Sequence, residues 1–164
     1  MAFVDGGSSC KKRKFAPGDS PSTAGPTVVH GTWTPTLSDG TNLATLSTAL
    51  GSYTRIGDLV LAEVSVLCTS IGSASGQVRV SMPFARYHDP GVTALSSCGP
   101  IGYMTFGATG TMQDLLALRM DTDLNYAFLL RSEENSAGAS LTFAQIMSNG
   151  NTTVRASIVY RAAA

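Results

Sequence analysis

The sequence GSYTRIGDLVLAEVSVLCTSIGSASGQVRVSMPF, residues 51–84, contains two runs in which apolar and polar side chains alternate. In the first run, every second residue from Val60 to Cys68 is apolar. Successive side chains of a strand point to opposite faces, so this run predicts a half-buried strand of about ten residues. After a turn of small residues, alternation resumes over residues 78–82 and predicts a second strand that pairs with the first as a hairpin. Pro83 ends this hairpin, because proline has no N–H to donate to a strand ladder.

The composition is that of one domain rich in strands and turns. The chain has 164 residues, enough to bury roughly two-thirds of its unfolded surface around one core. Only 13% of its residues are charged, whereas 43% are hydrophobic and 17 are glycine. The low charge leaves much of the surface neutral, and interfaces between subunits are depleted in charge. We therefore expect a homo-oligomer.

Further strand signals follow the first hairpin. They lie at residues 92–97 and 101–106, in a second hairpin made of 116–120 and 126–130, and in a last hairpin formed by 141–147 and 154–160 around Asn149-Gly150. About eight to ten short strands with regular turn signals predict an all-β fold, an antiparallel β-sandwich or jelly-roll head. Trp33 and Tyr53 each lie where the chain enters a strand, and we expect them in the core or in a subunit interface.

The first 29 residues differ from the rest of the chain. They are rich in glycine and proline and have only isolated apolar side chains, so we assign residues 1–29 to an extended N-terminal arm and residues 30–164 to the β-sandwich domain. All three lysines of the chain lie in one basic run of the arm, and the sizeable apolar anchors beside that run are aromatic: Phe3, Lys11, Lys12, Arg13, Lys14 and Phe15.

The basic run has several possible roles. Such a run can contact phosphates, act as a nuclear-import signal, lie against an acidic protein surface or remain a solvated tail. Four charges without interleaved aromatic residues do not indicate specific binding of nucleic acid, so we favour docking on a protein partner.

The cysteines and the N-terminus indicate synthesis in a reducing compartment. Cys10, Cys68 and Cys98 form an odd set without paired spacing, which argues against a disulfide framework. Residues 1–7 lack the apolar run of a secretory leader, and no apolar run reaches the roughly 18 residues needed to span a bilayer. We expect a chain made in the cytoplasm without a membrane partner.

The sequence offers few groups for catalysis or metal binding. His30 and His88 are the only imidazoles, and His88 beside Asp89 could form half of a catalytic triad, although a solvated loop histidine suits the pattern better. Neither the histidines nor the cysteines have the spacing of a zinc site. Residues 121–125, DTDLN, begin like a calcium loop but lack the glycine and the carboxylate that such a loop needs at its sixth and twelfth positions. We predict no enzymatic activity, no metal and no cofactor.

Three motifs, in order, resemble a domain common in the virion proteins of tailed bacteriophages. They are GTWTPTL at residues 31–37, GSYTRIG at 51–57 and SASGQVRVSMPF at 73–84. In that domain a G-x-W-x-P-x-L opening, a G-x-Y-x-[RK]-[IV]-G entry and a glycine-containing exit that ends in P-F recur in tail-fibre tips and related decorations. The resemblance implies a β-sandwich or jelly-roll module, usually trimeric, with a virion role and no enzymatic activity.

The resemblance leaves the role within the virion open. Tail-fibre tips usually follow a long shaft, whereas about 30 residues precede the domain here, so we expect first a capsid decoration or cement protein whose arm docks on the major capsid protein. The alternative is a tail-fibre or receptor-binding component that contacts a host-surface glycan through loop residues, for which the candidates are Tyr87, His88, Asp89 and Tyr103. A carbohydrate-binding module outside any virus is a lesser alternative.

Overall fold

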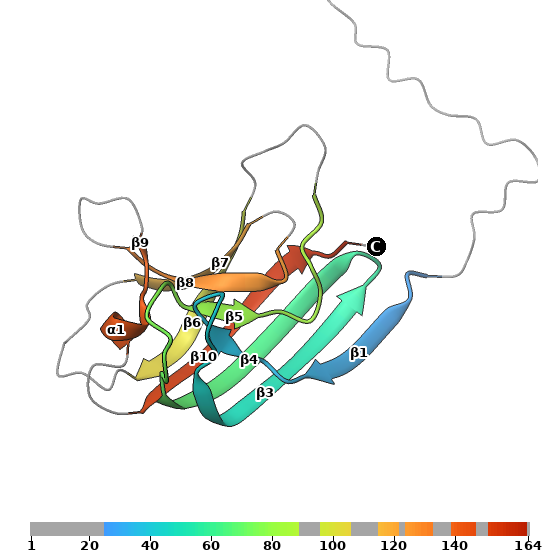
Figure 1. The fold of residues 1–164 in the computed structure, drawn as a ribbon. Coiled ribbons are helices and arrows are strands. Elements are labelled where there is room, and N and C mark those ends of the chain that lie inside the picture. The colour runs from blue at the N-terminus through green and yellow to red at the C-terminus, as the bar shows by residue number, and fades with distance from the viewer. Residues whose placement is uncertain are drawn as a thin grey trace, which may run out of the picture.

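The computed structural model describes residues 25–88, 96–105, 115–121, 124–132, 139–146 and 151–163. Within these ranges the chain is almost entirely β-strand, joined in one sheet of ten strands (Figure 1). The neighbour order is β1-β3-β4-β10-β6-β7-β8-β5-β2, with β9 paired to β8. The predicted all-β antiparallel fold is confirmed.

The elements have these bounds: β1 Val28–Trp33, β2 Leu37–Ser38, β3 Thr45–Ile56, β4 Leu59–Ser70, β5 Arg79–Ser81, β6 Ser97–Thr105, β7 Leu115–Met120, β8 Tyr126–Ser132, β9 Ala139–Ser140, α1 Phe143–Ile146 and β10 Thr152–Arg161. Strand β1 thus begins inside the stretch that we assigned to the arm, and residues 1–24 of that arm lie outside the described residues.

The sheet curls like a half-barrel, so that it encloses the core between two layers. The long-stranded layer consists of β1, β3, β4, β10 and β6, and the short-stranded layer consists of β6, β7, β8, β5 and β2. Strand β6 belongs to both layers, because its first part, up to Pro100, pairs with β7 and its second part, from Ile101, pairs with β10. Pro100 suits the position where β6 changes its partner, because proline has no N–H to donate to a strand ladder.

Strand β4 has the predicted alternation. Val60, Val66 and Cys68 are fully buried, and the residues between the buried positions face away from the core. The hairpin partner was predicted wrongly, because β4 pairs with β3 and not with residues 78–82. Gly57 makes the tight turn between β3 and β4 at a φ of 62°, in the left-handed region that glycine adopts without strain.

Residues 78–82 lie in the short-stranded layer. Val78, Val80 and Met82 are buried as the alternation predicted, but β5 pairs with β8 on one side and with β2 on the other. The small residues 72–76 carry the chain between the layers, and Ser75 donates its N–H to Asp39 Oδ2 at 3.0 Å on the way. Alternation therefore predicted the buried face correctly and the neighbouring strand incorrectly.

The second predicted hairpin is confirmed, since β7 pairs with β8. Two other predictions are wrong. Residues 97–105 form one strand, β6, where we expected two short strands at 92–97 and 101–106. Residues 92–95 lie outside the described residues. The last hairpin does not form either, because β10 pairs with β4 and β6 instead of residues 141–147.

A one-turn helix, α1, occupies most of the stretch 141–147, for which we expected a strand. Gln145 Oε1 accepts the backbone N–H of Thr142 at 2.8 Å, which is one half of a capping box. The helix buries Phe143 and Ile146 at the edge of the core. The sequence signal T-x-x-Q was therefore present at 142–145.

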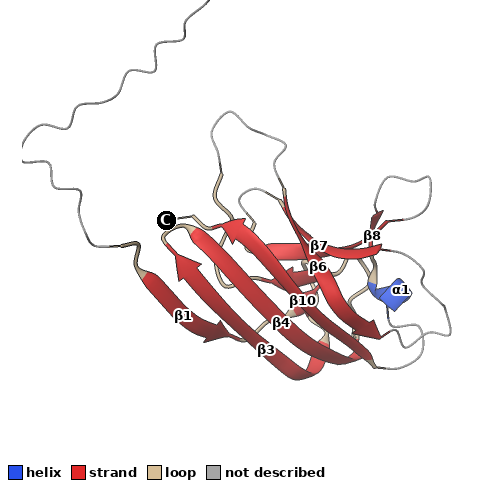
Figure 2. Ribbon diagram, turned by 180° about the vertical axis from the view of Figure 1, so that it is seen from behind, coloured by secondary structure: helices blue, strands red, loops and turns tan. Residues whose placement is uncertain are grey.

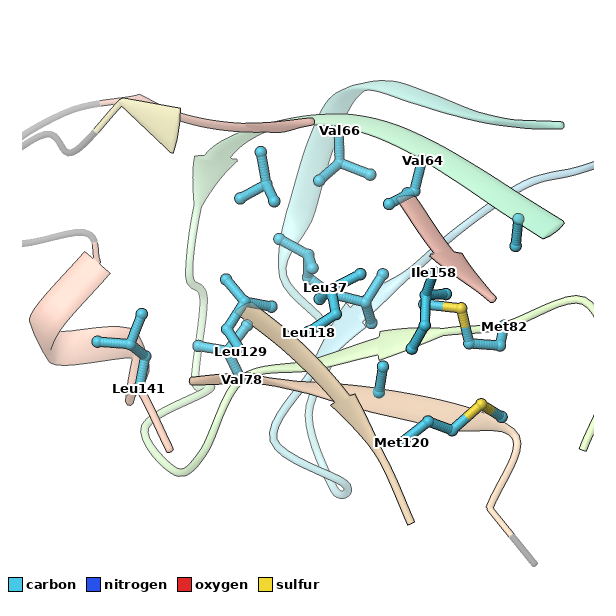
Figure 3. Packing of buried hydrophobic residues seen from close by; sticks show 14 of the residues in the cluster. Leu37, Val64, Val66, Val78, Met82, Leu118, Met120, Leu129, Leu141 and Ile158 are labelled. Carbon is cyan, nitrogen blue, oxygen red and sulfur yellow. The ribbon is translucent and has the colours of Figure 1, made fainter. Parts of the chain in front are cut away.

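The core lies between the layers (Figure 3). Its largest fully buried side chains come from both layers and include Tyr160, Phe143, Leu37, Leu118, Met120 and Leu129. Trp33 and Tyr53 are partly buried against this cluster, and Trp33 Nε1 donates to the carbonyl oxygen of Ser81 at 3.2 Å. In the described ranges, no helix has the length and apolar character needed to cross a membrane.

Candidate functional site

The outer face of the long-stranded layer is the main candidate surface. We use this name for the side chains of β1, β3, β4 and β10 that point away from the core, and Figure 2 shows these strands side by side. The strand register places them in rows across the sheet. One row is Val28, Ile56, Leu59 and Arg161; the next is His30, Thr54, Leu61 and Val159; the third is Thr32, Ser52, Glu63 and Ser157.

The first two rows carry five large aliphatic side chains that remain exposed. They form what we call the apolar band: Val28, Ile56, Leu59, Leu61 and Val159, with exposed fractions of 51%, 40%, 45%, 42% and 49%. Directly opposite residues of an antiparallel pair lie about 4.5–5.5 Å apart, so neighbouring members of the band touch. The band is therefore one continuous patch instead of five scattered residues.

The third row borders a shallow hollow of about 850 Å³. Small residues such as Ser52, Ser65 and Ser157 leave this space, and Leu50, which is 64% exposed, projects beside it. Glu63 and Arg155 also line the hollow. The outer face thus combines an apolar band with a hollow of mixed polarity.

The two charged groups beside the hollow have no ionic partner in the described part of the chain. Glu63 Oε2 accepts a hydrogen bond from Ser52 Oγ at 3.3 Å, and the Arg155 guanidinium lies over the Tyr103 ring at 5.5 Å. Both groups are exposed, so they can pair with charges on another molecule.

The residues of the predicted loop site are only partly within the described residues. Tyr87 lies under the Arg161 guanidinium at 4.8 Å and lines a hollow of about 320 Å³ together with the buried Arg86. His88 is exposed, and Asp89 lies outside the described residues. Tyr103 pairs with Arg155, six positions before Arg161 on β10, which corresponds to roughly 20 Å along a strand. Tyr87 and Tyr103 therefore do not share a site.

The predicted docking residues of the arm, Phe3, Lys11, Lys12, Arg13, Lys14 and Phe15, all lie outside the described residues.

The two histidines do not assemble catalytic groups among the described residues. His30 Nδ1 lies 2.9 Å from Thr54 Oγ1, its neighbour in the second row of the outer face. His88 follows Tyr87, whose N–H bonds to the carbonyl oxygen of Arg161 at the end of β10. The described residues contain no group of three or more His, Cys, Asp or Glu side chains that could hold a metal ion.

Two ionisable side chains with shifted pKa values serve the fold. Asp39 accepts backbone N–H groups of Asn42 at 2.7 Å, Thr41 at 2.9 Å and Ser75 at 3.0 Å, and these bonds hold the pKa of its carboxyl well below the usual range. Burial raises the pKa of Tyr160 to about 12. Both groups join loops to strands, and neither lies on the outer face.

The sequence interpretation missed the apolar band, although a signal for it was present. In β4 the run Leu59-Val60-Leu61-Ala62 is apolar at both parities, and Ile158-Val159-Tyr160 repeats this in β10. A strand that is apolar on both sides is typical of one covered on both faces. Because polar residues such as Glu63, Ser65 and Thr69 follow in β4, the outward face of the whole strand was predicted to be polar.

The chain was compared with known proteins. No family model matches it, and no curated protein matches it. Among solved structures, the crystal structure of the Dettilon tailspike protein (gp208) is similar, with a TM-score of 0.58 and 18% identity. The match covers 81% of this chain and 24% of the tailspike chain, so our chain corresponds to about a quarter of that protein. At this identity the likeness establishes the fold.

Proposed function

We propose that this chain is a non-enzymatic structural module of a tailed-phage virion, and that it is the folded head of a tail-fibre or tailspike-type component. The observation that carries the proposal is the fold shared over 81% of the chain with part of a tailspike protein. The three motifs at residues 31–37, 51–57 and 73–84 point in the same direction. On these grounds the tail role ranks above capsid decoration.

The chemistry of the described residues suits a structural role. His30 has a threonine hydroxyl as its neighbour instead of a carboxylate, so it lacks the orienting partner of a general base. Some of the described charged side chains pair locally, as Arg161 does with Asp58 at 2.7 Å and Arg119 with Asp121 at 3.2 Å. The partners that we propose are two further copies of the chain in a homotrimer and other virion proteins.

Capsid decoration is the second candidate function. It is favoured by the basic run Lys11, Lys12, Arg13 and Lys14 with Phe15 beside it, which suits an acidic protein surface. In this role the run would bind the shell, and binding would weaken as salt rises.

The position of the protein on the particle tests the proposal. An antibody against the recombinant chain, visualised with gold on the phage that encodes it, should label the tail. Antibody first absorbed with the recombinant chain is the control and should leave the particles unlabelled. Label confined to the head shell would establish the decoration role, and particles without label would refute a virion role.

A matched deletion separates the two candidates further. If the decoration role is correct, full-length chain should bind particles that lack it, and a chain without residues 2–16 should not. If the tail role is correct, the chain without residues 2–16 should still attach to the tail through contacts of its folded head. Neither this chain nor the full-length chain should then bind bare capsid shells.

A further inference from the structure

We propose that the outer face of the long-stranded layer is the surface through which copies of this chain contact each other, with the apolar band, which lies at the end of the layer beside the β3–β4 turn, as its apolar part. This inference depends on the proposed function in one respect only, namely that the number of copies is three. An antiparallel sheet that faces water normally places polar side chains outward. Here Leu59, Leu61 and Val159 occupy outward positions on the two central strands, β4 and β10, and each is more than 40% exposed.

The dimensions of the face match those of a stable interface. Four strands spaced by about 4.8 Å are roughly 19 Å wide, and ten residues of a strand at about 3.3 Å each are roughly 33 Å long. The product is on the order of 600 Å², which is at the lower end of the roughly 600–1,000 Å² that each partner typically buries in a specific complex. A smaller peptide or ligand would leave most of this face in water.

The charges of the face favour a second copy as the occupant. Glu63 and Arg155 have opposite signs, flank one hollow, and lack ionic partners within the described part of the chain. A second copy brings one of each, so both can be paired without any other molecule. The rest of the face presents mainly aliphatic, serine and threonine side chains, which can pack against the same kinds of side chain on a second copy, together with His30 and with Arg161, which pairs with Asp58.

The shape of the face also suits self-association. Leu50 projects at the edge of the hollow with 64% of its surface exposed, and the hollow of about 850 Å³ beside it is formed by small residues. A projecting residue of one copy can therefore fill the hollow of the next. No strand or helix of the described residues lies over β3, β4 and β10 on this side (Figure 2). Around a threefold axis, three such faces enclose one shared apolar core.

The first test replaces the centre of the band without changing the fold. The double variant Leu61→Thr/Val159→Thr keeps branched or short side chains that suit an exposed strand, and the matched control Leu43→Thr alters a side chain that is 64% exposed but lies in the loop before β3. The mass of the full chain is measured by light scattering over a range of concentrations. Wild type and the control should give about 51 kDa, three times the 17.0 kDa of one chain.

The double variant should dissociate to single chains. Leu61 and Val159 lose aliphatic contact area inside the proposed interface when they become threonine, so the dissociation constant should rise at least about 30-fold. Circular dichroism should show the same strand content in all three proteins. If the double variant assembles as tightly as wild type, the band is not the interface and the proposal is refuted.

A second measurement keeps the test decisive if the double variant does not fold. In a background with Cys10→Ser and Cys98→Ser, Leu61→Cys places a thiol in the band and Leu43→Cys places one outside it. A bulky maleimide should label the Leu61→Cys protein slowly at high concentration and quickly after dilution, whereas the Leu43→Cys protein should react quickly at both. Equal, fast labelling of both proteins at high concentration would overturn the proposal.

The outcomes separate this inference from the proposed function. A wild-type trimer that survives the double substitution refutes the interface assignment and leaves the virion role standing. A wild-type chain that remains monomeric at micromolar concentration refutes the interface between copies and indicates that another molecule covers the band. A dimer that the same substitutions dissociate keeps the interface assignment and refutes the threefold arrangement. Gold labelling of the particle decides the virion role independently of all three.

Discussion

Replacing Tyr160 by phenylalanine removes one hydroxyl from the core and tests how the chain after β5 is attached to β10. Tyr160 is 2% exposed, and its hydroxyl donates to the carbonyl oxygen of Phe84 at 3.1 Å and accepts the N–H of Phe84 at 3.3 Å. The ring of Phe84 in turn contacts the ring of Tyr53 edge-on at 4.9 Å and lies under Arg55 at 4.9 Å. The hydroxyl therefore fixes a residue that connects the segment after β5 to β3.

The expected cost follows from the two backbone groups that lose their partner. A buried donor or acceptor left unpaired costs about 1–3 kcal/mol, and Phe84 is only partly buried, so we expect Tyr160→Phe to lower the free energy of unfolding by about 2 kcal/mol. For a chain of this size, that corresponds to a fall in Tm of roughly 4–8 °C.

The measurement is urea unfolding at one fixed protein concentration, because association would shift the midpoint. Tyr103→Phe is the matched control, since Tyr103 is 52% exposed and its hydroxyl contributes no described hydrogen bond. The control should unfold at the midpoint of wild type. A Tyr160→Phe midpoint equal to that of wild type, with an unchanged slope, would show that the hydroxyl does not secure Phe84.

The same pair of proteins has a defined dependence on pH. Burial raises the pKa of Tyr160 to about 12 in the folded chain, whereas an unfolded tyrosine has a pKa of about 10. The folded state therefore favours the neutral phenol, and this contribution to stability is complete below about pH 10 and is lost as the pH rises towards 12. The stability advantage of wild type over Tyr160→Phe should therefore disappear as the pH rises through that window, whereas it should be constant below about pH 10.

Three further predictions concern other parts of the fold. Gly99→Ala should strongly destabilise the protein, because the new methyl group would overlap the carbonyl oxygen of Ser157, whereas Gly102→Ala on the same strand meets no atom closer than 3.8 Å and should be near neutral in thermal unfolding. Asp39→Ala should lower the unfolding midpoint at pH 7, and the difference from wild type should narrow as the pH falls below about 4, because the pKa of the folded Asp39 carboxyl is depressed by its backbone N–H donors. In native protein treated with a maleimide and mapped by mass spectrometry, the exposed Cys98 should be labelled well before the buried Cys68, and equal labelling would contradict the burial that raises the pKa of the Cys68 thiol.

The sequence predicts which way the strands face better than it predicts which strands pair. Alternation shows which face of a strand each side chain occupies, so the buried positions of β4 and of residues 78–82 were predicted correctly. Pairing depends on how the chain turns, and the turn of small residues at 72–76 is compatible with a hairpin as well as with a crossing between layers. The crossing is secured by Asp39, a residue 36 positions from Ser75 in the sequence, and no local pattern reports such a bond.

Strand β3 was missed as the partner of β4 for a related reason. Its residues 45–56 lie at the side of the core, so none of them is fully buried and the apolar period is weak. Helix α1, in contrast, had a readable signal in the T-x-x-Q of its capping box, which the apolar residues around it obscured.

The apolar band shows how one strand can serve two purposes. In β4 the residues at even positions fill the core, and Leu59 and Leu61 at odd positions face outward beside Val159 of β10. Successive side chains of a strand point to opposite faces, so the two sets can change independently. Polar substitutions at the odd positions should therefore affect assembly and leave folding intact, whereas substitutions at Val60 or Val66 should unfold the chain. Among the described residues of β7, β8, β5 and β2, no large hydrophobic side chain is exposed in this way, and the outward Phe128 is covered by Arg79 and Arg119. This asymmetry between the layers is the reason that we propose association on the long-stranded side.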